Sequence, residues 1–142
     1  MVSSSQLHAL LAASDYVELP NGVYLIDEPL VIDRPGVTLR GRNRFGTVIK
    51  QTTASEPCII VQPNCAGVEL VNFTLDRHGL AGVGGNGLEF GPGNTGCSYS
   101  LCDSLIVRNQ ADGILLGNGE ASELRNTVVE SCLGQGVTLT NS

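Results

Sequence analysis

Asp76 and His78 are the residues of this sequence whose types and spacing come closest to acid–base chemistry. They stand at the end of a predicted strand and lead into a glycine-rich stretch over residues 79–87. A carboxylate and an imidazole at the rim of a groove could act as base and acid in the cleavage of a polysaccharide. The same residues also suit a polar turn that ends a strand. We favour the turn, because the repeat described below assigns Val107 and Glu130 to the positions equivalent to Asp76, so that no acidic column forms.

A pair of carboxylates would be a second sign of catalysis. Hydrolysis of a glycoside uses two of them, about 5 to 9 Å apart, and neighbouring strands of a sheet lie about 4.8 Å apart. Asp103 is a further acid to consider, but its predicted neighbours along the stack are Asn72 and Asn126, where a structural role accounts for it. The sequence therefore predicts no catalytic residue. Were the chain an enzyme, Asp76, His78 and Asp103 would be the candidates.

Four arginines that lie close together in the sequence form the other candidate site: Arg34, Arg40, Arg42 and Arg44. This group could bind an anionic sugar or an acidic partner surface, and a solvated turn explains it equally well. Cys97 and Cys102 have neither a second cysteine pair nor a nearby histidine to complete a zinc site. The glycines of residues 82–87 lack the following helix that a dinucleotide site requires. We expect no metal and no cofactor.

The composition excludes several classes of protein. The net charge of −6 and the pI of about 4.7 leave no basic surface for nucleic acid. No apolar run reaches the length of about 18 residues that spans a membrane. The N-terminus has no basic region followed by a long apolar stretch, so we expect no signal peptide. The five cysteines are an odd number, and we expect them to be reduced thiols that pack as small apolar side chains.

An internal repeat defines the elements that would position these residues. Residues 101–118 match residues 124–141 at an offset of 23, and the same unit occurs upstream at offsets of 31 and 26. Each unit contains short apolar runs rich in Val, Ile and Leu, with the two-residue alternation of strands. We assign them to three families of strands, which begin with Val23–Ile26, Val37–Leu39 and Thr47–Lys50. No run is long enough for a crossover helix, which excludes a sheet built from alternating strands and helices.

A sharp bend is predicted between the second and third families of strands. This position holds residues that enter the left-handed conformation at low cost: Gly41, Asn72, Asp103 and Asn126. A bend that recurs once per turn is what the corner of a solenoid requires, and stacked asparagine side chains can bond along such a corner ladder.

The strands and bends carry a resemblance to a known superfamily. The run LPNGVYLI at residues 19–26, with the stretches 29–32, 36–41 and 46–49, resembles right-handed parallel β-helices of the pectate-lyase type, which include phage tailspikes. The resemblance implies an all-β fold, a right-handed single-stranded parallel β-helix of about six rungs. It implies no single activity, since this fold hosts lyases, hydrolases, epimerases and non-enzymatic virion parts.

The two ends of the predicted solenoid differ. Residues 6–13 follow a serine run and suit a short amphipathic helix, which would cover the first rung as solenoids require. We therefore divide the chain into an N-terminal capping segment over residues 1–15 and a parallel β-helix domain over residues 16–142. The last predicted strand has no such cap, so we expect either that the chain is a fragment or that another subunit covers this end.

These observations favour a non-enzymatic structural module of a phage virion, made in the host cytoplasm. We expect a capsid decoration (cement) protein that stabilises the shell, assembled as a homotrimer and bound to virion proteins such as the major capsid protein, but not to nucleic acid or membrane. A tailspike-type polysaccharide lyase or hydrolase, or a fragment of one, is the first alternative. The second is a glycan-binding module, for which three Tyr and three Phe are a small stock of stacking platforms.

Overall fold

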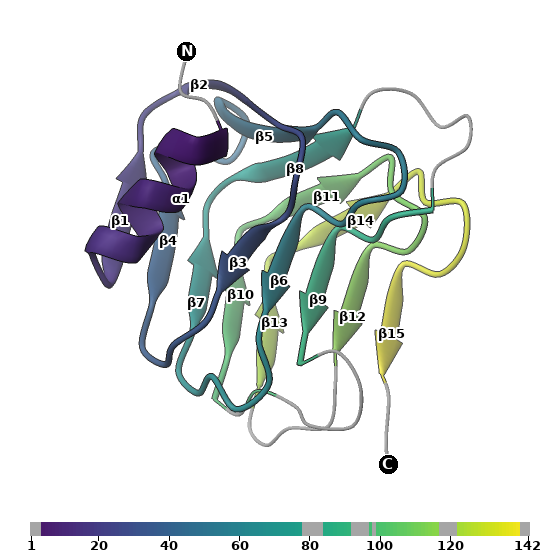
Figure 1. Cartoon of the computed structure of the whole chain (residues 1–142). Coiled ribbons are helices and arrows are strands. Elements are labelled where there is room, and N and C mark those ends of the chain that lie inside the picture. The colour runs from purple at the N-terminus through teal and green to yellow at the C-terminus, as the bar shows by residue number, and fades with distance from the viewer. Residues whose placement is uncertain (1–3, 78–83, 92–96, 98, 117–121, 140–142) are drawn as a thin grey trace.

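The computed structural model of the chain is an all-β parallel solenoid with one short N-terminal helix (Figure 1). It describes residues 4–77, 84–91, 97, 99–116 and 122–139. Within these residues the chain runs through fifteen short strands, which stack into three parallel sheets of five strands each. We call the sheets A, B and C, in the order in which the chain visits them.

Each sheet takes every third strand of the chain. Sheet A contains β1 (Tyr16–Leu19), β4 (Thr38–Gly41), β7 (Glu69–Val71), β10 (Leu101–Asp103) and β13 (Glu123–Arg125). Sheet B contains β2 (Gly22–Ile26), β5 (Thr47–Gln51), β8 (Thr74–Arg77), β11 (Ile106–Arg108) and β14 (Val128–Glu130). Sheet C contains β3 (Leu30–Ile32), β6 (Ile59–Val61), β9 (Leu88–Phe90), β12 (Ile114–Leu116) and β15 (Val137–Leu139).

The predicted parallel solenoid is confirmed, but it has about four turns rather than about six rungs. One strand of the first turn was also assigned to the wrong family. Val23–Ile26 and Thr47–Lys50 were assigned to separate families, whereas β2 pairs with β5, and β3 stands at the head of sheet C. Short runs of Val, Leu and Ile are interchangeable by composition, and only their pairing in space distinguishes one wall from another.

The interior is filled by like side chains that stack along each wall. The register of sheet A aligns Val17, Leu39, Leu70, Cys102 and Leu124. The register of sheet C aligns Leu30, Ile59, Leu88, Ile114 and Val137. Since neighbouring strands lie about 4.8 Å apart, branched and small side chains fill this narrow space. Phe73 and Phe90 are the largest side chains that it buries completely.

Helix α1 (Ser4–Ala13) closes the N-terminal end of the solenoid (Figure 1). It packs against β1, β2 and β3, and its Leu7 and Leu11 are buried. The helix predicted over residues 6–13 is therefore confirmed, and it begins two residues earlier, at Ser4.

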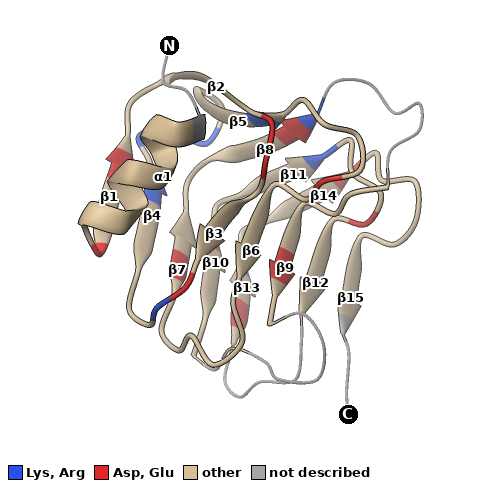
Figure 2. Ribbon diagram, viewed as in Figure 1, with Lys and Arg blue, Asp and Glu red and all other residues tan. Residues whose placement is uncertain are grey.

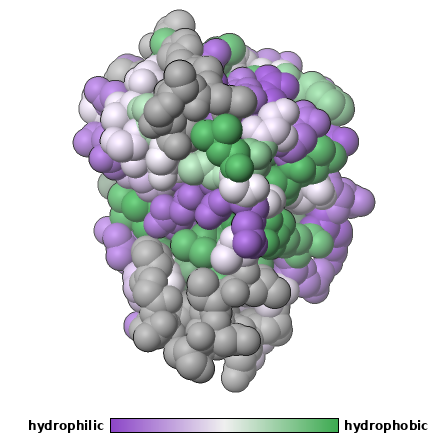
Figure 3. Space-filling view, turned by 90° about the vertical axis from the view of Figure 1, so that its right-hand side faces the viewer, coloured by the Kyte–Doolittle hydropathy of each residue, from purple (hydrophilic) through white to green (hydrophobic). Residues whose placement is uncertain are grey.

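No described helix or further strand covers the opposite end of the solenoid. Figure 3 looks onto this end and shows apolar side chains gathered among polar ones. Leu124 and Val137 are each 39% exposed, whereas Cys102 and Ile114, their equivalents one turn earlier, are 1% and 0% exposed. A hollow of about 450 Å³ lies beside Leu124 and Val137, with Val129 on its wall. We call the surface formed by Leu124, Val129 and Val137 the open end.

Candidate functional site

Asp76 lies near the end of β8, at the corner between sheets B and C, and is almost completely buried. Its Oδ1 accepts hydrogen bonds from the backbone N–H of Arg77 and from Asn109 Nδ2, both at 2.7 Å. Arg108 Nη2 lies 3.2 Å from Oδ2 of the same carboxyl group. The carboxylate is therefore held by three donors, two of which belong to the next turn of the solenoid.

The charged residues at this end of sheet B alternate in sign along the stack (Figure 2). The register places Lys50 beside Asp76 and Arg108 beside Glu130. The ion pair between Asp76 and Arg108 joins the two halves of this column. Alternating charges on neighbouring strands attract one another, so the column stabilises the register of the stack.

The sequence-based neighbour of Asp76 was wrong by one residue. Val107 was expected opposite Asp76, but it pairs with Leu75. Because successive side chains of a strand point to opposite faces, this shift places Arg108 beside Asp76 and turns Val107 into the interior, where it is completely buried. Glu130 was assigned correctly to the same column.

Arg77 points into the solenoid and is only 2% exposed. Its Nε and Nη2 donate to Gln110 Oε1 at 3.0 and 2.8 Å, and its Nη1 donates to the carbonyl oxygen of Thr53 at 2.7 Å. Weaker contacts reach the carbonyl oxygens of Ala54 and Asn86, both at 3.4 Å. Within the described residues, the guanidinium thus has only uncharged acceptors. It joins segments that precede the sheet C strands of three successive turns.

Burial and neighbouring charges shift the pKa values of two groups in this network. Burial disfavours the ionised form of Asp76, but the hydrogen bonds from Asn109 and the Arg77 N–H, together with the charge of Arg108, outweigh burial and lower its pKa. Burial raises the pKa of the neighbouring Cys58 thiol to about 12, although the charge of Arg77 opposes the rise. Asp76 is therefore ionised and the Cys58 thiol is protonated at neutral pH.

Glu89 is the described carboxyl group whose pKa is raised. Burial is the largest cause, and the nearby charge of Glu56 adds to it, while a hydrogen bond from Asn86 Nδ2 at 3.3 Å opposes it. The neighbours of Glu89 in the register of sheet C are Ile60 and Leu115. No second carboxylate therefore stands beside Glu89 in its column on β6, β9 and β12.

We expect Asp76 to make the stability of the fold depend on acid pH. An aspartate in an unfolded chain titrates near about 3.9, and Asp76 titrates lower in the folded state. Its contribution is therefore fully present above about pH 5 and is lost as the pH falls through the lowered folded-state pKa. Denaturant unfolding at pH 7 and pH 3 should show a smaller loss of stability for Asp76→Asn than for the wild type. The exposed Asp33→Asn should behave like the wild type, and equal losses in all three proteins would contradict this role.

The corner between sheets A and B contains Ser104 where Asp103 was predicted. Asn72, Ser104 and Asn126 have φ values of 69°, 57° and 50°, and the register places Gly41 in line with them. Asp103 instead ends β10, where it pairs with Val71 and Arg125. The predicted ladder of left-handed residues is thus correct at Asn72 and Asn126 and wrong at Asp103. Gly41 lies in line with them but does not have a positive φ.

The polar side chains of this corner bond to the backbone and to Asp103 rather than to a column of asparagines. Asn72 Nδ2 donates to the carbonyl oxygens of Gly41 and Arg42, both at 3.2 Å. Asp103 Oδ1 accepts from Ser104 Oγ at 3.0 Å and from Asn126 Nδ2 at 3.4 Å. Asp103 therefore has a structural role beside the corner.

Of the three residues named as catalytic candidates, the two that the structure describes, Asp76 and Asp103, are not brought together as a site. Asp103 belongs to sheet A and precedes the corner between sheets A and B, whereas Asp76 stands at the corner between sheets B and C. The width of sheet B separates them. His78 lies outside the described residues.

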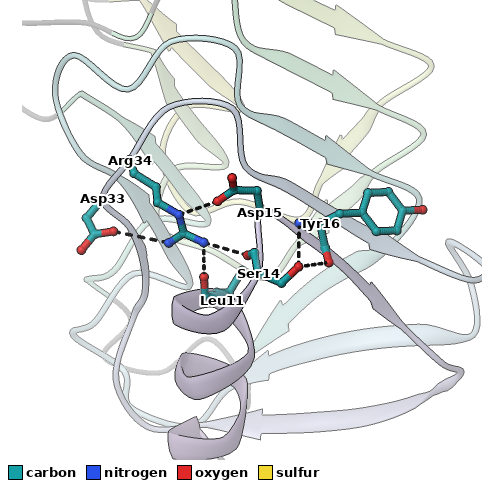
Figure 4. A network of polar contacts seen from close by, with 6 residues as sticks. All are labelled: Leu11, Ser14, Asp15, Tyr16, Asp33 and Arg34. Carbon is teal, nitrogen blue, oxygen red and sulfur yellow. Dashed lines mark hydrogen bonds and ion pairs between the residues drawn. The ribbon is translucent and has the colours of Figure 1, made fainter.

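Arg34 fastens helix α1 to the first turn of the solenoid (Figure 4). Its Nη2 donates to the carbonyl oxygens of Leu11 and Ser14 at 2.5 and 2.7 Å, and its Nε lies 2.7 Å from Asp15 Oδ1. Asp33 Oδ1 lies 3.8 Å from Nη1. A cation that binds the last carbonyl groups of a helix also interacts favourably with the negative end of the helix dipole. Arg34 is therefore a capping residue and stands apart from the other three arginines.

Arg34→Ala should loosen α1 without unfolding the solenoid. Loss of the hydrogen bonds to the end of the helix is expected to lower local stability by about 1–2 kcal/mol. Hydrogen exchange at the amides of residues 4–13 should therefore become faster, while exchange in β5 and β8 stays unchanged. The exposed Arg40→Ala is the matched control, and unchanged exchange in α1 would show that Arg34 does not hold the helix.

Arg40, Arg42 and Arg44 lie near the corner between sheets A and B. Arg40 is exposed on β4, and Arg42 Nε lies 4.0 Å from Glu18 Oε1. Arg44 Nη1 donates to the carbonyl oxygen of Asn126 at 2.9 Å, and its guanidinium lies 5.0 Å from the centre of the Phe45 ring. An open hollow of about 510 Å³ lies between these side chains and the corner, lined by Arg42, Asn43, Arg44, Phe45, Asn72, Ser104 and Asn126.

Asn109 and Gln110 are the residues of the Asp76 network that the sequence analysis missed. A signal for them was present, because polar residues end or follow the sheet B strands of three successive turns: Gln51, Arg77 and Gln110. Gln51 pairs with Arg77 and is fully buried, as is Gln110. Polar residues that recur at an inward position indicate an internal hydrogen-bonded network.

Two searches of the described residues concern other kinds of site. None of the described helices is long and apolar enough to cross a membrane. The same residues contain no group of three or more His, Cys, Asp or Glu side chains that could hold a metal ion. All five cysteines are free thiols, and four of them are buried.

Comparison with known proteins adds no relative. No protein-family model matches the chain, and neither a curated protein nor a solved structure matches it.

Proposed function

We propose that this chain is a non-enzymatic structural module that works by assembling with other protein subunits. The observation that carries the proposal is the open end, where side chains of interior type are exposed and three strand edges are left for pairing. Such edges and apolar surfaces are normally covered, since they otherwise promote aggregation. A stiff solenoid with one closed end and one open end suits a building block.

The polar network supports this role rather than catalysis. Asp76 is held by three donors, and Arg77 by buried acceptors, so both are used within the fold. Asp103 bonds to Ser104 and Asn126 at a corner. Asp76 and Asp103 therefore serve to hold successive turns together.

A phage virion is the setting that we propose for the module. The support is the likeness of the sequence to β-helices of the pectate-lyase type, which include tailspikes, together with the net charge of −6 and the free thiols. We propose a capsid decoration protein that binds the major capsid protein. The homotrimer stays a prediction, as do the alternatives of a tailspike-type polysaccharide enzyme and a glycan-binding module.

Two measurements test the proposal. The chain should cosediment with capsid shells assembled from a major capsid protein, and it should release no reducing ends or unsaturated sugars from capsular or O-antigen polysaccharides. Polysaccharide cleavage by the wild type that Asp76→Asn abolishes would replace the structural role with the enzymatic one. Absence of shell binding would remove the virion setting.

A further inference from the structure

We infer that the open end pairs with the open end of a second copy of this chain, in a closed two-fold arrangement in which the two β13 strands run antiparallel. The inference rests on the proposed function, in that it takes the chain to be an assembly module, and it names the partner of the open end. Four features of the last turn and of the opposite end carry it.

The backbone of β13 is arranged for such a pair. The Glu123 N–H donates to the carbonyl oxygen of Ser100, and the carbonyl oxygen of Arg125 accepts from the Ser104 N–H. Both residues therefore direct their backbone groups toward β10. Because these groups point to opposite edges at successive residues of a strand, the N–H and C=O of Leu124 face the open edge. Two antiparallel β13 strands centred on Leu124 would exchange both of these hydrogen bonds.

The outward side chains of β13 are complementary to themselves in this arrangement. Glu123 and Arg125 flank Leu124 on the outer face of sheet A, where Arg125 Nη2 lies 2.6 Å from Glu123 Oε2. A two-fold axis through Leu124 places Glu123 of each copy opposite Arg125 of the other. Opposite charges that face each other across antiparallel strands are stabilising, and like charges are destabilising. The same axis brings the two Leu124 side chains together on the inner face.

The other two edge strands fit the same axis. Rotation about it exchanges sheets B and C, so that β14 of one copy meets β15 of the other. The Val128 N–H donates to the carbonyl oxygen of Leu105, and the carbonyl oxygen of Gly136 accepts from the Ile114 N–H. Val128 and Gly136 therefore direct their backbone groups toward the previous turn, and the next residues, Val129 and Val137, direct theirs toward the open edge. In all three strands, the residue with free edge groups has an apolar side chain that points inward. The two open ends would therefore share one continuous core.

The closed end of the solenoid excludes the competing head-to-tail arrangement. Helix α1 covers the first turn, and its buried Leu7 and Leu11 occupy the place where another turn would stack. A second copy cannot place its open end there unless α1 leaves. Self-association through the open end is thus restricted to a two-fold pair, which closes the assembly, whereas head-to-tail contacts would form filaments.

Charge reversal tests the pairing. Sedimentation equilibrium over a range of protein concentrations should show an assembly with an even number of chains. In the simplest case it has twice the mass of 14.9 kDa, and it has six chains if the predicted homotrimer also forms through another surface. Glu123→Arg and Arg125→Glu should each place like charges opposite each other at two positions, and each should weaken the pairing about tenfold or more. Glu69→Arg makes the same change in the same column of sheet A, away from the open end, and should leave the pairing unchanged.

Mixing the two charge variants makes the test independent of any loss of folding. Glu123→Arg carries two arginines at this edge and Arg125→Glu carries two glutamates, so an equimolar mixture should form a heterodimer with wild-type affinity. The double variant Glu123→Arg/Arg125→Glu should pair with itself in the same way. A monomeric wild type, an assembly with an odd number of chains, or a dimer that the reversals leave unchanged would overturn the inference.

The pairing experiment and the tests of the proposed function can fail independently of each other. A dimer that responds to charge reversal but cleaves polysaccharide would support the pairing and contradict the structural role. A monomer that binds capsid shells would overturn the pairing and leave the structural role in place.

Discussion

Replacement of Arg77 by alanine should lower the free energy of unfolding by about 3–5 kcal/mol. The guanidinium is buried, and its removal leaves Gln110 Oε1 with only the weak thiol donor of Cys58 at 3.6 Å. The carbonyl oxygens of Thr53 and Asn86 each lose one donor and keep one backbone N–H, from Glu56 and Cys58 respectively. Buried acceptors that lose their partner retain the full cost of desolvation. The vacated volume adds the cost of a cavity.

Denaturant unfolding followed by circular dichroism measures this loss. Arg40→Ala, which removes the same side chain from the exposed face of β4, should change the free energy of unfolding by less than about 0.5 kcal/mol. Arg77→Met keeps most of the volume and separates packing from hydrogen bonding: it should recover the part of the loss that is due to the cavity. A loss below about 1 kcal/mol for Arg77→Ala would show that the network contributes little.

Gly41→Ala should be the second strongly destabilising substitution, with a loss of about 2–4 kcal/mol. A Cβ at Gly41 would lie 2.3 Å from the carbonyl oxygen of Asn72 and 3.0 Å from the side chains of Thr47 and Phe73. The carbonyl belongs to the backbone of the next corner, so the clash can be relieved only by moving the two turns apart.

Gly84→Ala is the matched control for this substitution. A Cβ at Gly84 meets no atom within 4 Å, so the substitution should leave stability unchanged or slightly raised. The midpoints of thermal unfolding of the two variants and the wild type test this expectation: only Gly41→Ala should have a lower midpoint. Equal midpoints for Gly41→Ala and Gly84→Ala would show that the corner tolerates a wider spacing of its turns.

The sequence predicted the solenoid because strand period, Val, Leu and Ile content and bend residues all indicated the same fold. The alignment of residues 101–108 with the previous turn was shifted by one residue. The misassignments of Asp103 and Val107 at the candidate sites both follow from this shift. The offset of 23 aligned Leu101 with Leu124, whereas the register aligns Cys102 with Leu124, and Cys102 is the inward residue, at 1% exposed. A one-residue shift exchanges the two faces of a strand, and leucine is the more hydrophobic of the two residues. Cysteine nevertheless fills a narrow interior well.

The consequences of this shift explain why the polar sites were harder to predict than the walls. With Cys102 aligned to Leu70, Ser104 rather than Asp103 falls in line with Asn72, and Arg108 rather than Val107 falls beside Asp76. The Arg77 network could not be assembled from the sequence, because its acceptors are mostly backbone carbonyls of loops between strands. The type of a residue says nothing about where such a carbonyl points.

The contrast between the two ends of the solenoid determines where unfolding begins. In a stack where each turn contacts only its neighbours, structure is lost from the terminal unit with the weakest interface. That unit is the last turn, since α1 protects the first. Arg44 departs from this one-dimensional scheme, because it follows a strand of the second turn and bonds to Asn126 in the last one. Loss of the last turn breaks this bond, so Arg44 links the melting of the final turn directly to a segment 82 residues earlier in the chain.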